Sequence, residues 1–394
     1  MTQPTLEVLI ETTPGNYVDV GNYTGQVNIT QPFDRNNDSF LTGTLNLTFK
    51  DVDGSFNPAN PSSTYGPYMV PMTKIIIQAT FQTVTYALYT GWAQSFSYRN
   101  TSNNEIATMT IDAIDGLGVL AQTTISNVMY YNTTGTTTGF RIYGILLTAL
   151  YYGAPSMPNL IYVGGSYCQA DPGTTRTALQ AMQTADNTEN GALYCAPNGT
   201  LTWLSRDQIY RRSSGTPTTF TDTPGSGITY QDVTFAYDSD FISNYVTVAA
   251  PTITPYTVYS PTSIANYFQR NLVRNDVNMN NDYDAYNQAL QLLYGRSEPI
   301  LRISNFTLNA NGADATRTAA ALAMDYYDPI IVTRHDPDGV AITKNLYCVG
   351  FTWRISPGNW TCVVQTAEPD LYGFVLDSPN VLAGGILGTN QLTY

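Results

Sequence analysis

Apolar and polar residues alternate with a period of two over much of the first 120 residues, which is typical of strands with one buried face. Residues Thr44–Phe49 read Thr-Leu-Asn-Leu-Thr-Phe, and Lys74–Phe81 is rich in β-branched apolar residues. No strand is a continuous buried run, so we expect a mostly antiparallel barrel or curved sheet. The predicted strands lie near Thr5–Ile10, Gln26–Ile29, Thr44–Phe49, Lys74–Phe81, Ala87–Tyr98 and Ala107–Ala113.

The spacing changes between residues 121 and 227. Apolar residues in Phe140–Tyr152 and Thr175–Asp186 recur every three or four positions, which predicts two helices. Gly191–Trp203 is predicted to form a hairpin that turns at the Pro-Asn-Gly of residues 197–199. This segment therefore reads as a small α+β module. Surface linkers are expected at Arg211–Thr218 and Thr221–Gly227.

From residue 228 onward the period-two pattern returns, with one helix predicted over Asp282–Tyr294 by its Asp-rich start and its end at Gly295. The number of strands suggests a second copy of the first barrel, although the two sequences show no convincing repeat. The expected strands are Gly227–Tyr237, Tyr245–Ala249, Leu301–Leu308, Pro329–Arg334, Leu346–Ile355 and Trp360–Gln365.

The sequence thus predicts a mainly β protein in which two antiparallel β-barrels flank a small helical and hairpin module. The expected divisions are 1–120 for the first barrel, 121–227 for the α+β insertion, 228–370 for the second barrel with its inserted helix at 282–294, and 371–394 for a C-terminal extension.

Composition and charge narrow the class of protein. Hydrophobic residues make up 43% of the chain, with 30 Tyr and 14 Phe, which is incompatible with disorder. The net charge is −13 and only three lysines are present (Lys50, Lys74 and Lys344), so sequence-specific nucleic-acid binding is disfavoured. No apolar run approaches the length of a membrane span, and the first residues do not resemble a signal peptide, so no stable membrane insertion is expected.

The four cysteines show no metal-binding spacing: Cys168, Cys195, Cys348 and Cys362. A hairpin turn centred on residues 356–359 would place Cys348 opposite Ala367 and Cys362 opposite Trp353. The tempting Cys348–Cys362 disulfide is therefore not expected. Free, buried thiols fit a protein assembled in a reducing cytoplasm.

Catalytic chemistry has few candidates. His335 is the only histidine, and it reads as an exposed turn residue without a nucleophile motif. Two segments, Asp51-x-Asp53-Gly54 and Asp336-x-Asp338-Gly339, resemble the opening of calcium loops but lack the closing Glu, so Asx turns explain them, with calcium left as an alternative.

Three carboxylate pairs could in principle serve a glycosidase, but each has a capping or turn explanation: Asp282/Asp284, Asp112/Asp115 and Glu368/Asp370. Four tryptophans could form a sugar platform, but their placement in strands favours core or interface positions: Trp92, Trp203, Trp353 and Trp360. The sequence therefore assigns no catalytic, cofactor-binding or metal-binding residue, requires no cofactor, and predicts a protein that is not an enzyme.

Four segments together resemble minor tail proteins, or baseplate (tail-tip) hub proteins, of long-tailed bacteriophages, especially siphophages of actinobacterial hosts. The first runs from the strand at Gly43–Phe49 through Asp51-Val-Asp-Gly-Ser-Phe-Asn-Pro58 and Lys74–Gln78 to Tyr89-Thr-Gly-Trp92. The others are Ile111–Leu120, Phe241–Val248 and the tail Leu371–Leu387.

This resemblance implies two tube-type barrels and a structural virion protein, the homotrimeric hub at the distal end of a tail. Such a hub joins the tail tube to tip or fibre proteins and gates DNA passage. The acidity of the chain would then repel DNA from the lumen, and the alternative is that it only keeps the protein soluble. The implied partners are further copies of the chain, distal tail or tail-tube proteins, the tape measure protein, and fibre or spike proteins. The implied location is the virion tail tip, after assembly in the host bacterial cytoplasm. The alternatives are a receptor- or glycan-binding tail protein and, third, a tail-associated cell-wall hydrolase.

Overall fold

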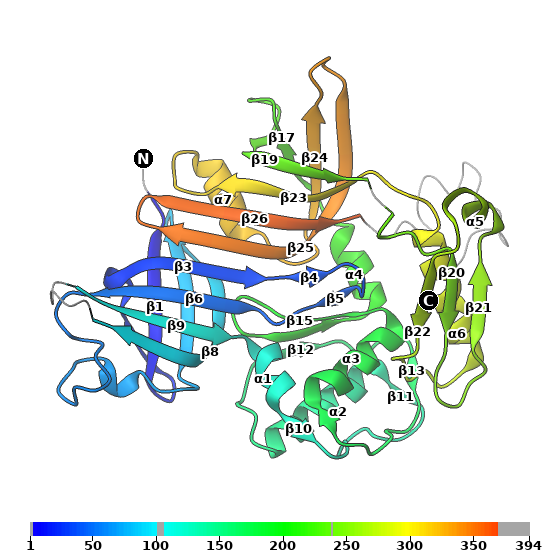
Figure 1. The fold of residues 1–394 in the computed structure, drawn as a ribbon, viewed down its shortest axis with the longest axis horizontal. Helices are drawn as coiled ribbons and strands as arrows, with labels where there is room; N and C mark the ends of the chain where they lie inside the picture. The colour runs from blue at the N-terminus through cyan, green and yellow to red at the C-terminus, as the bar shows by residue number, and fades with distance from the viewer. Residues whose placement is uncertain (1–2, 101–105, 238, 369–394) are drawn as a thin grey trace.

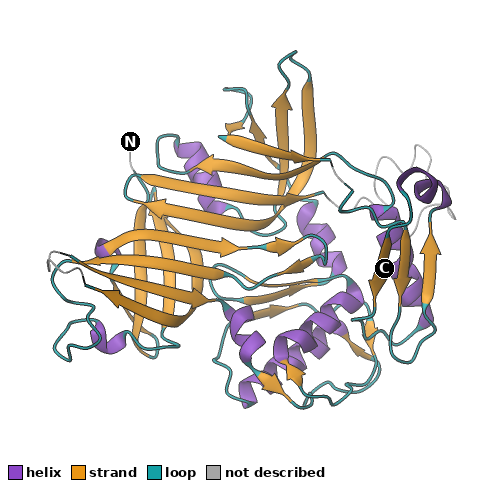
Figure 2. Cartoon of the chain, viewed as in Figure 1, coloured by secondary structure: helices purple, strands orange, loops and turns teal. Residues whose placement is uncertain are grey.

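The structure is a computed structural model that describes residues 3–100, 106–237 and 239–368. Strands dominate it, and one large mixed sheet runs through most of the chain, with the longest helices gathered below and beside it (Figures 1 and 2). The prediction of a mainly β protein is therefore confirmed. The predicted tail resemblance at Leu371–Leu387 and the C-terminal extension 371–394 lie outside the described residues.

Seven strands near the N-terminus form a first closed arrangement, called barrel one. Their pairing order is β2-β1-β7-β8-β9-β6-β3, and the chain itself closes the circuit by leading from β2 through a short 3-10 turn into β3. All six strands predicted for this region are present, and β2 is additional. The strands are β1 (Thr5–Thr13), β2 (Asn16–Asp19), β3 (Thr24–Gln31), β6 (Thr44–Asp51), β7 (Lys74–Phe81), β8 (Val84–Arg99) and β9 (Ala107–Ile114).

A second closed arrangement, barrel two, forms near the C-terminal end of the described residues. Its pairings run β18-β17-β24-β25-β26-β23-β19, and the chain joins β18 directly to β19. A helix, α7 (Ala315–Ala323), contacts β23. The strands are β17 (Thr218–Thr221), β18 (Ile228–Thr229), β19 (Asp232–Ala236), β23 (Arg302–Asn309), β24 (Pro329–His335), β25 (Ala341–Ser356) and β26 (Asn359–Ala367).

The two barrels have the same strand topology. If β17, β18, β19, β23, β24, β25 and β26 are matched in order to β1, β2, β3, β6, β7, β8 and β9, every pairing in one barrel has its counterpart in the other. One difference is direction, since β17 runs parallel to both of its neighbours whereas β1 runs antiparallel to both of its own. Barrel two is therefore mixed, not antiparallel as predicted.

The longest strands show how each barrel turns its corner. β8 and β25 both have 16 residues, and each pairs with one neighbour along its first half and with another along its second half. The change of partner coincides with a bulge, between Ala93 and Ser95 in β8 and between Cys348 and Gly350 in β25. A bulge bends and twists a strand, which lets one strand serve two walls of a barrel.

Aligning the barrels on these bulges reveals a repeat that the sequence comparison missed. Phe96-Ser-Tyr-Arg99 falls on Phe351-Thr-Trp-Arg354, since each follows its bulge at the same distance. Asn46-Leu-Thr-Phe49 likewise falls on Asn305-Phe-Thr-Leu308, through their partners in β9 and β26. The matches are only four residues long and the insertions between them differ, so they emerge only when strand register is known.

The segment after barrel one is mostly helical and is called the helical module. It was predicted to be separate, but Leu117, Ile145 and Met182 belong to the same continuous hydrophobic core as both barrels. Both predicted helices and the predicted hairpin are present. Its elements are α1 (Gly116–Gln122), β10 (Thr124–Ile125), β11 (Thr136–Thr137), α2 (Thr138–Tyr151), β12 (Asn159–Ile161), β13 (Tyr167–Cys168), β14 (Arg176–Thr177), α3 (Ala178–Glu189), β15 (Ala192–Cys195), β16 (Leu201–Leu204) and α4 (Arg206–Ser213).

Two linker predictions also need correction. Residues Arg211–Ser213 are the last residues of helix α4, which begins after its N-cap Ser205. Thr218–Thr221 is strand β17, which pairs with β24 inside barrel two, so the boundary predicted at residue 227 is wrong. The remaining stretch, 222–227, is a loop.

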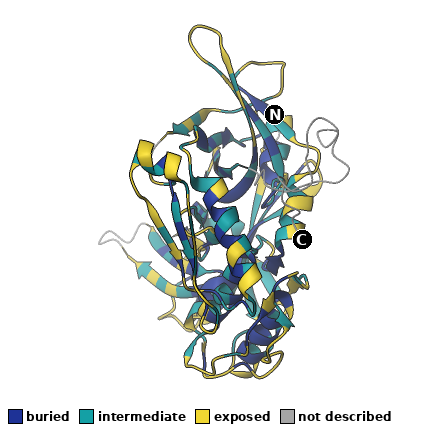
Figure 3. Cartoon of the chain, turned by 90° about the vertical axis from the view of Figure 1, so that its right-hand side faces the viewer, coloured by how far each residue is buried: buried dark blue, intermediate teal, exposed yellow. Residues whose placement is uncertain are grey.

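Residues 239–301 form an inserted module with its own core. The predicted strand Tyr245–Ala249 was assigned to barrel two but lies here, in a three-stranded sheet of order β21-β20-β22. The predicted helix at 282–294 is α6, whose buried Ala285, Ala289 and Leu292 pack on that sheet, while its other side is exposed (Figure 3). The elements are β20 (Tyr245–Val248), β21 (Tyr256–Tyr259), α5 (Pro261–Tyr267), β22 (Asn271–Arg274) and α6 (Asp282–Arg296).

Candidate functional site

His335 ends strand β24 and contacts the loop that follows β17. Its Nδ1 lies 2.7 Å from Asp222 Oδ1, and its backbone N–H donates to Asp222 Oδ2 at 2.8 Å. Arg334 Nη1 donates to the same carboxylate at 2.9 Å. Burial alone would raise the pKa of Asp222, but these hydrogen bonds outweigh it and lower that pKa. The histidine therefore lies at a strand end that enters a turn, but it is half-buried against this loop instead of exposed as predicted.

Asp51 and Asp53 hold the loop after β6. The buried Asp51 carboxylate accepts hydrogen bonds from the backbone N–H groups of Ser55 and Phe56 and from the Tyr98 hydroxyl at 2.8–3.1 Å. Asp53 accepts from Ser55 N and from the Tyr23 hydroxyl. These carboxylates are occupied by turn and strand donors, in the manner of an Asx turn.

Asp336 and Asp338 shape the hairpin turn between β24 and β25. Gly339 N donates to Asp336 O, Val340 N donates to the Asp338 side chain, and Gly339 has a φ of +85°. Within the described ranges, no three His, Cys, Asp or Glu side chains are grouped so that they could hold a metal ion.

The carboxylate pairs separate into individual structural roles. Asp112 lies on an outward face, where Asn46 Nδ2 and Ser95 Oγ donate to it at 2.7 and 2.9 Å. Asp282 and Asp284 lie in the first turn of α6, where Asn281 caps the helix. Glu368 ends the described residues, and its predicted partner Asp370 lies outside them.

Asp115 is buried and joins three parts of the chain. Its Oδ2 accepts from Gly43 N at 2.8 Å and its Oδ1 from Gly118 N at 3.1 Å, so it caps α1 and fixes the segment before β6. Burial raises its pKa from 3.8 to about 7, although the N–H groups of Gly118 and Gly43 oppose that rise. Burial likewise raises the pKa of Asp186 to about 7, even though Trp203 Nε1 donates to it at 2.8 Å.

Because the pKa values of Asp115 and Asp186 are raised in the folded state, we expect the protein to be more stable at pH 5 than at pH 8. Between about pH 4 and 7 the folded state binds more protons than the unfolded state, so the free energy of unfolding falls as pH rises. The loss is at most about 4 kcal/mol per carboxyl, from a shift of about three units at about 1.4 kcal/mol each. Urea unfolding at pH 5, 6.5 and 8 and at one protein concentration measures it.

The substitutions Asp115→Asn and Asp186→Asn should each flatten this pH dependence, because an amide does not titrate. Asp112→Asn is the matched control, since it makes the same substitution at an exposed position. A wild-type protein that gains stability from pH 5 to pH 8 would contradict the prediction.

All four tryptophans lie in the core, as predicted, with at most 5% of their surface exposed. Trp203 is fully buried, and Lys74 Nζ lies 5.8 Å from the centre of the Trp92 ring. A sugar platform needs exposed rings, so these residues provide none.

All four cysteines are free and buried, as predicted. Trp353 faces Cys362 as expected, whereas Cys348 faces Thr366 instead of Ala367 because the bulge shifts the register. Burial raises the pKa of the Cys168 thiol to about 11, which makes it a poor nucleophile at neutral pH.

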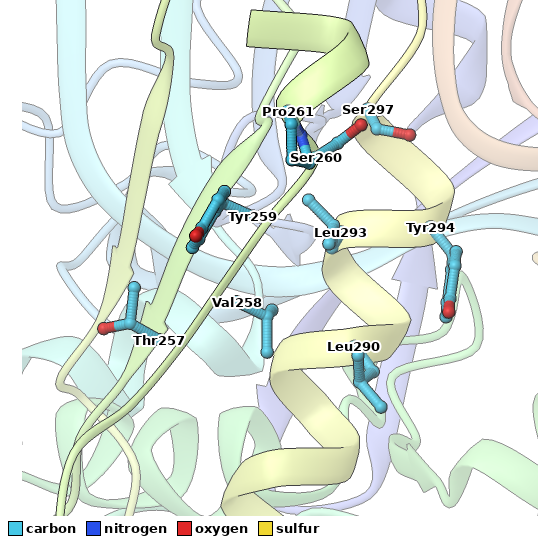
Figure 4. Close-up of a pocket in the computed structure, with 9 residues that line it drawn as sticks. All are labelled: Thr257, Val258, Tyr259, Ser260, Pro261, Leu290, Leu293, Tyr294 and Ser297. Atoms are coloured by element: carbon cyan, nitrogen blue, oxygen red, sulfur yellow. The ribbon is translucent and has the colours of Figure 1, made fainter.

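A pocket of about 440 Å³ opens in the inserted module between β21 and α6 (Figure 4). Its nine lining residues include no carboxylate, imidazole or thiol, so it offers no acid, base or nucleophile beyond hydroxyl groups. They are Thr257, Val258, Tyr259, Ser260, Pro261, Leu290, Leu293, Tyr294 and Ser297.

Among the described residues, each helix is too short or too polar to traverse a lipid bilayer.

The most distinctive feature is the joint between the barrels. The second half of β25 pairs antiparallel with β3, from Phe351↔Gln31 to Ile355↔Val27. Within the large sheet, the joint makes a continuous run of eight strands, called the eight-stranded sheet, in the order β19-β23-β26-β25-β3-β6-β9-β8, and Figure 1 looks onto it. Trp353 and Ile29, which face each other across the joint, are 3% and 0% exposed.

This sheet ends in two strands that are paired on one side only among the described residues. Beyond its bulge β8 pairs only with β9, and β19 pairs only with β23. Their inward-facing residues Phe96, Tyr98, Val233 and Phe235 are half-buried, whereas the equivalent residues at the internal joint are buried. An unpaired strand edge offers N–H and C=O groups to another strand. These two edges are the candidate functional site.

Sequence analysis did not identify this site. It predicted the strand at Ala87–Tyr98 and a strand covering β19, but a strand prediction does not say which edge lacks a partner. The signal that could have found it is the Phe-x-aromatic-Arg motif, which occurs in both β8 and β25.

The fold defines the class of protein: two barrels with the same strand topology share one sheet and are flanked by helices. No family model and no curated protein matches the chain. Solved structures with similar folds include the tail protein from Neisseria meningitidis MC58 (TM-score 0.59, 13% identity, 93% of this chain and 97% of that one). Another is the 43 kDa tail protein of prophage MuSo2 from Shewanella oneidensis (TM-score 0.57, 13% identity, 93% and 99%).

A third similar structure is the half-lidded Francisella PdpA–VgrG complex, with a TM-score of 0.50 and 9% identity over 93% of this chain and 58% of that one. The chain therefore has the fold of phage tail proteins.

Proposed function

We propose that this chain is a non-enzymatic structural protein of a phage tail and that three copies form the hub at its distal end. The observation that carries the proposal is the duplicated strand topology, because one chain holds two barrels with matching strand pairings. Three copies would present six barrels, which matches a three-fold tip to a six-fold tail tube. The similar folds of two tail proteins over nearly their whole lengths support the same role.

The outward face of the eight-stranded sheet suits the wall of a channel. Along its central strands it carries Asn46, Thr48, Thr110, Thr352 and Thr361, whereas the opposite face is apolar core. Hydroxyl and amide side chains offer DNA few fixed charges to bind. The few charges on this face include Asp112 and Arg354, which are of opposite sign, so the acidity of the chain is not concentrated there.

In the proposed role the hub joins the tail tube to tip, fibre or spike proteins and lets DNA pass once the tip opens. The tape measure protein and distal tail proteins are the partners expected on its tube side. The siphophage setting remains part of the proposal.

The test is a count of copies in the assembled tail. A cryo-EM reconstruction of the tail tip should show three copies of this chain, arranged as a ring of six barrels. Six equivalent copies would instead make it a distal ring protein with a six-fold axis. Absence from purified virions would overturn the proposal.

A further inference from the structure

We propose that residues 371–376, which follow the described part of the chain, add a fourth strand to the inserted module of their own chain. This strand lies antiparallel to β21 and covers the pocket between β21 and α6. The inference goes beyond the proposed function and does not depend on it. It is carried by an unpaired strand edge, by the apolar groove beside that edge, and by the point at which the chain leaves barrel two.

The unpaired edge belongs to β21, which pairs only with β20 among the described residues. Ser260 N donates to Asn244 O, so the backbone of Ser260 faces the β20 side. Backbone groups alternate in direction along an antiparallel strand, so the N–H and C=O groups of Thr257 and Tyr259 point away from β20. These are the groups to which a further strand can bind.

The groove lies beside this edge. Helix α6 packs mainly against β20 and β21, and the pocket lies between α6 and β21. Val258 of β21 and Leu293 of α6 both line it (Figure 4). Tyr259 and Tyr294 also line it and are 57% and 55% exposed, so a strand placed here would remove much aromatic surface from water.

The sequence of residues 371–376, Leu-Tyr-Gly-Phe-Val-Leu, fits this groove. The segment carries no charge, whereas Asp370 and Asp377 stand on either side of it, so no ionised group would lose its water in the pocket. In a strand, three of its large side chains share one face: Tyr372, Phe374 and Leu376.

Strand β26 leads the chain to the base of the inserted module. Near its end, Thr366 Oγ1 donates to Ile303 O of β23. Ser297, which lines the pocket, is only six residues before Ile303 in the chain. Six residues span at most about 20 Å. A segment that leaves Thr366 along the same route therefore reaches the pocket at Tyr372.

This route also gives the direction of the added strand. Ser260 and Ser297 line the pocket at the end from which the chain returns to barrel two. Tyr256 and Tyr286, whose ring centres lie 5.8 Å apart, mark the other end of the contact between β21 and α6. Because β21 runs towards Ser260, a segment that enters there runs antiparallel to it.

The register follows from placing Tyr372 beside Ser260. Phe374 is then opposite Val258, on the side that faces α6. Val375 is opposite Thr257, on the exposed side of the sheet. Gly373 is likewise opposite Tyr259.

The test is a set of cysteine pairs in the full-length chain under mild oxidation. Thr257→Cys with Val375→Cys, and Tyr259→Cys with Gly373→Cys, join directly opposite residues, whose Cβ atoms are close enough for a disulfide. We expect a disulfide within one chain, seen as a linked peptide by mass spectrometry and as a monomer on non-reducing gels. The four native cysteines are buried and should remain reduced.

The exchanged pairs are the matched controls, because they use the same four positions two residues out of register. Thr257→Cys with Gly373→Cys, and Tyr259→Cys with Val375→Cys, should cross-link far less. Equal cross-linking by all four pairs would show that the segment only collides with β21, and it would overturn the inference.

A second measurement is hydrogen exchange at the backbone N–H groups of Thr257 and Tyr259. Phe374→Asp places a carboxylate in the groove, so these two groups should exchange about tenfold faster than in the wild type. Val375→Asp adds the same charge on the exposed side and should leave their exchange unchanged. Equal exchange in the wild type and in Phe374→Asp would contradict the pairing.

Mixing the single variants Thr257→Cys and Val375→Cys separates docking within one chain from docking between copies. Covalent dimers from this mixture, without a disulfide in the double variant, would place the segment on a neighbouring copy and overturn the inference. Failure of all these tests would leave the hub proposal standing, because that proposal is decided by the number of copies in the tail.

Discussion

Replacing residues 238–300 with an Asn-Gly turn is expected to leave both barrels folded. Ala236 and Arg302, the ends of β19 and β23, are direct cross-strand partners, so a short loop through Tyr237 and Leu301 can connect them. The inserted module has its own hydrophobic cluster, separate from the main core. Its ties to the rest are polar, such as Arg296 with Asp38 and Gln169 Nε2 with Met279 O at 2.7 Å.

Removing the helical module, residues 116–213, is expected to prevent folding. Leu120, Ile142 and Ile145 are fully buried in the core that also contains the barrel residues. Each such side chain is worth about 1.5–3 kcal/mol, so losing all the large apolar side chains that the module buries exceeds a typical stability of about 5–15 kcal/mol.

Circular dichroism and urea unfolding of the two deletion variants measure this contrast. The 238–300 replacement should keep a cooperative transition and a strand-rich spectrum, whereas the 116–213 deletion should be insoluble or unfolded. If the second variant folded as well as the first, the shared core would not be structural.

Local pattern was sufficient for the longer strands of both barrels and for helices α2, α3 and α6. β6 and β7 bury every second residue, so period-two alternation located them to within two residues. The hairpin at residues 192–204 was predictable because its Pro-Asn-Gly turn needs the positive φ that Gly199 adopts. In these segments the local signal and the tertiary environment agree.

Pairing between distant segments was not predictable from pattern. β17 and β20 are both short strands with four residues, yet one joins barrel two and the other lies in the inserted module. Nothing in four residues specifies the partner strand. The sequence pattern also did not show that the helical module shares its core with the barrels. The pattern predicts which residues are buried, but it does not show which surfaces they are packed against.

The candidate site was hidden because it is defined by a missing neighbour. Tyr98 and Trp353 occupy equivalent places, but among the described residues Tyr98 pairs with a strand on one side only, whereas Trp353 pairs on both sides. The repeat that exposes this equivalence is four residues long, so it becomes meaningful only after the bulges align the two barrels. Similarly, Asp115 looked like an ordinary cap until its burial showed that it also fixes Gly43.

Phe235→Lys is expected to abolish association between copies without unfolding the chain. If the free edge of β19 is a contact between copies, Phe235 lies on the core side of that contact, where an ammonium group would lose its water at a cost of several kcal/mol. A loss of about 3 kcal/mol weakens an association about a hundredfold. In the separate chain Phe235 is only half-buried, so the lysine can reach solvent and the fold should persist.

Thr234→Lys is the matched control, because the adjacent residue points to the outward face and its side chain is exposed. It should associate as wild type does, whereas Phe235→Lys should sediment as a monomer with an unchanged circular dichroism spectrum. Because the two variants carry the same added charge one residue apart, a general effect of charge would weaken both equally. Only a strand edge buried on one face distinguishes them, so equal behaviour would show that β19 is not the contact between copies.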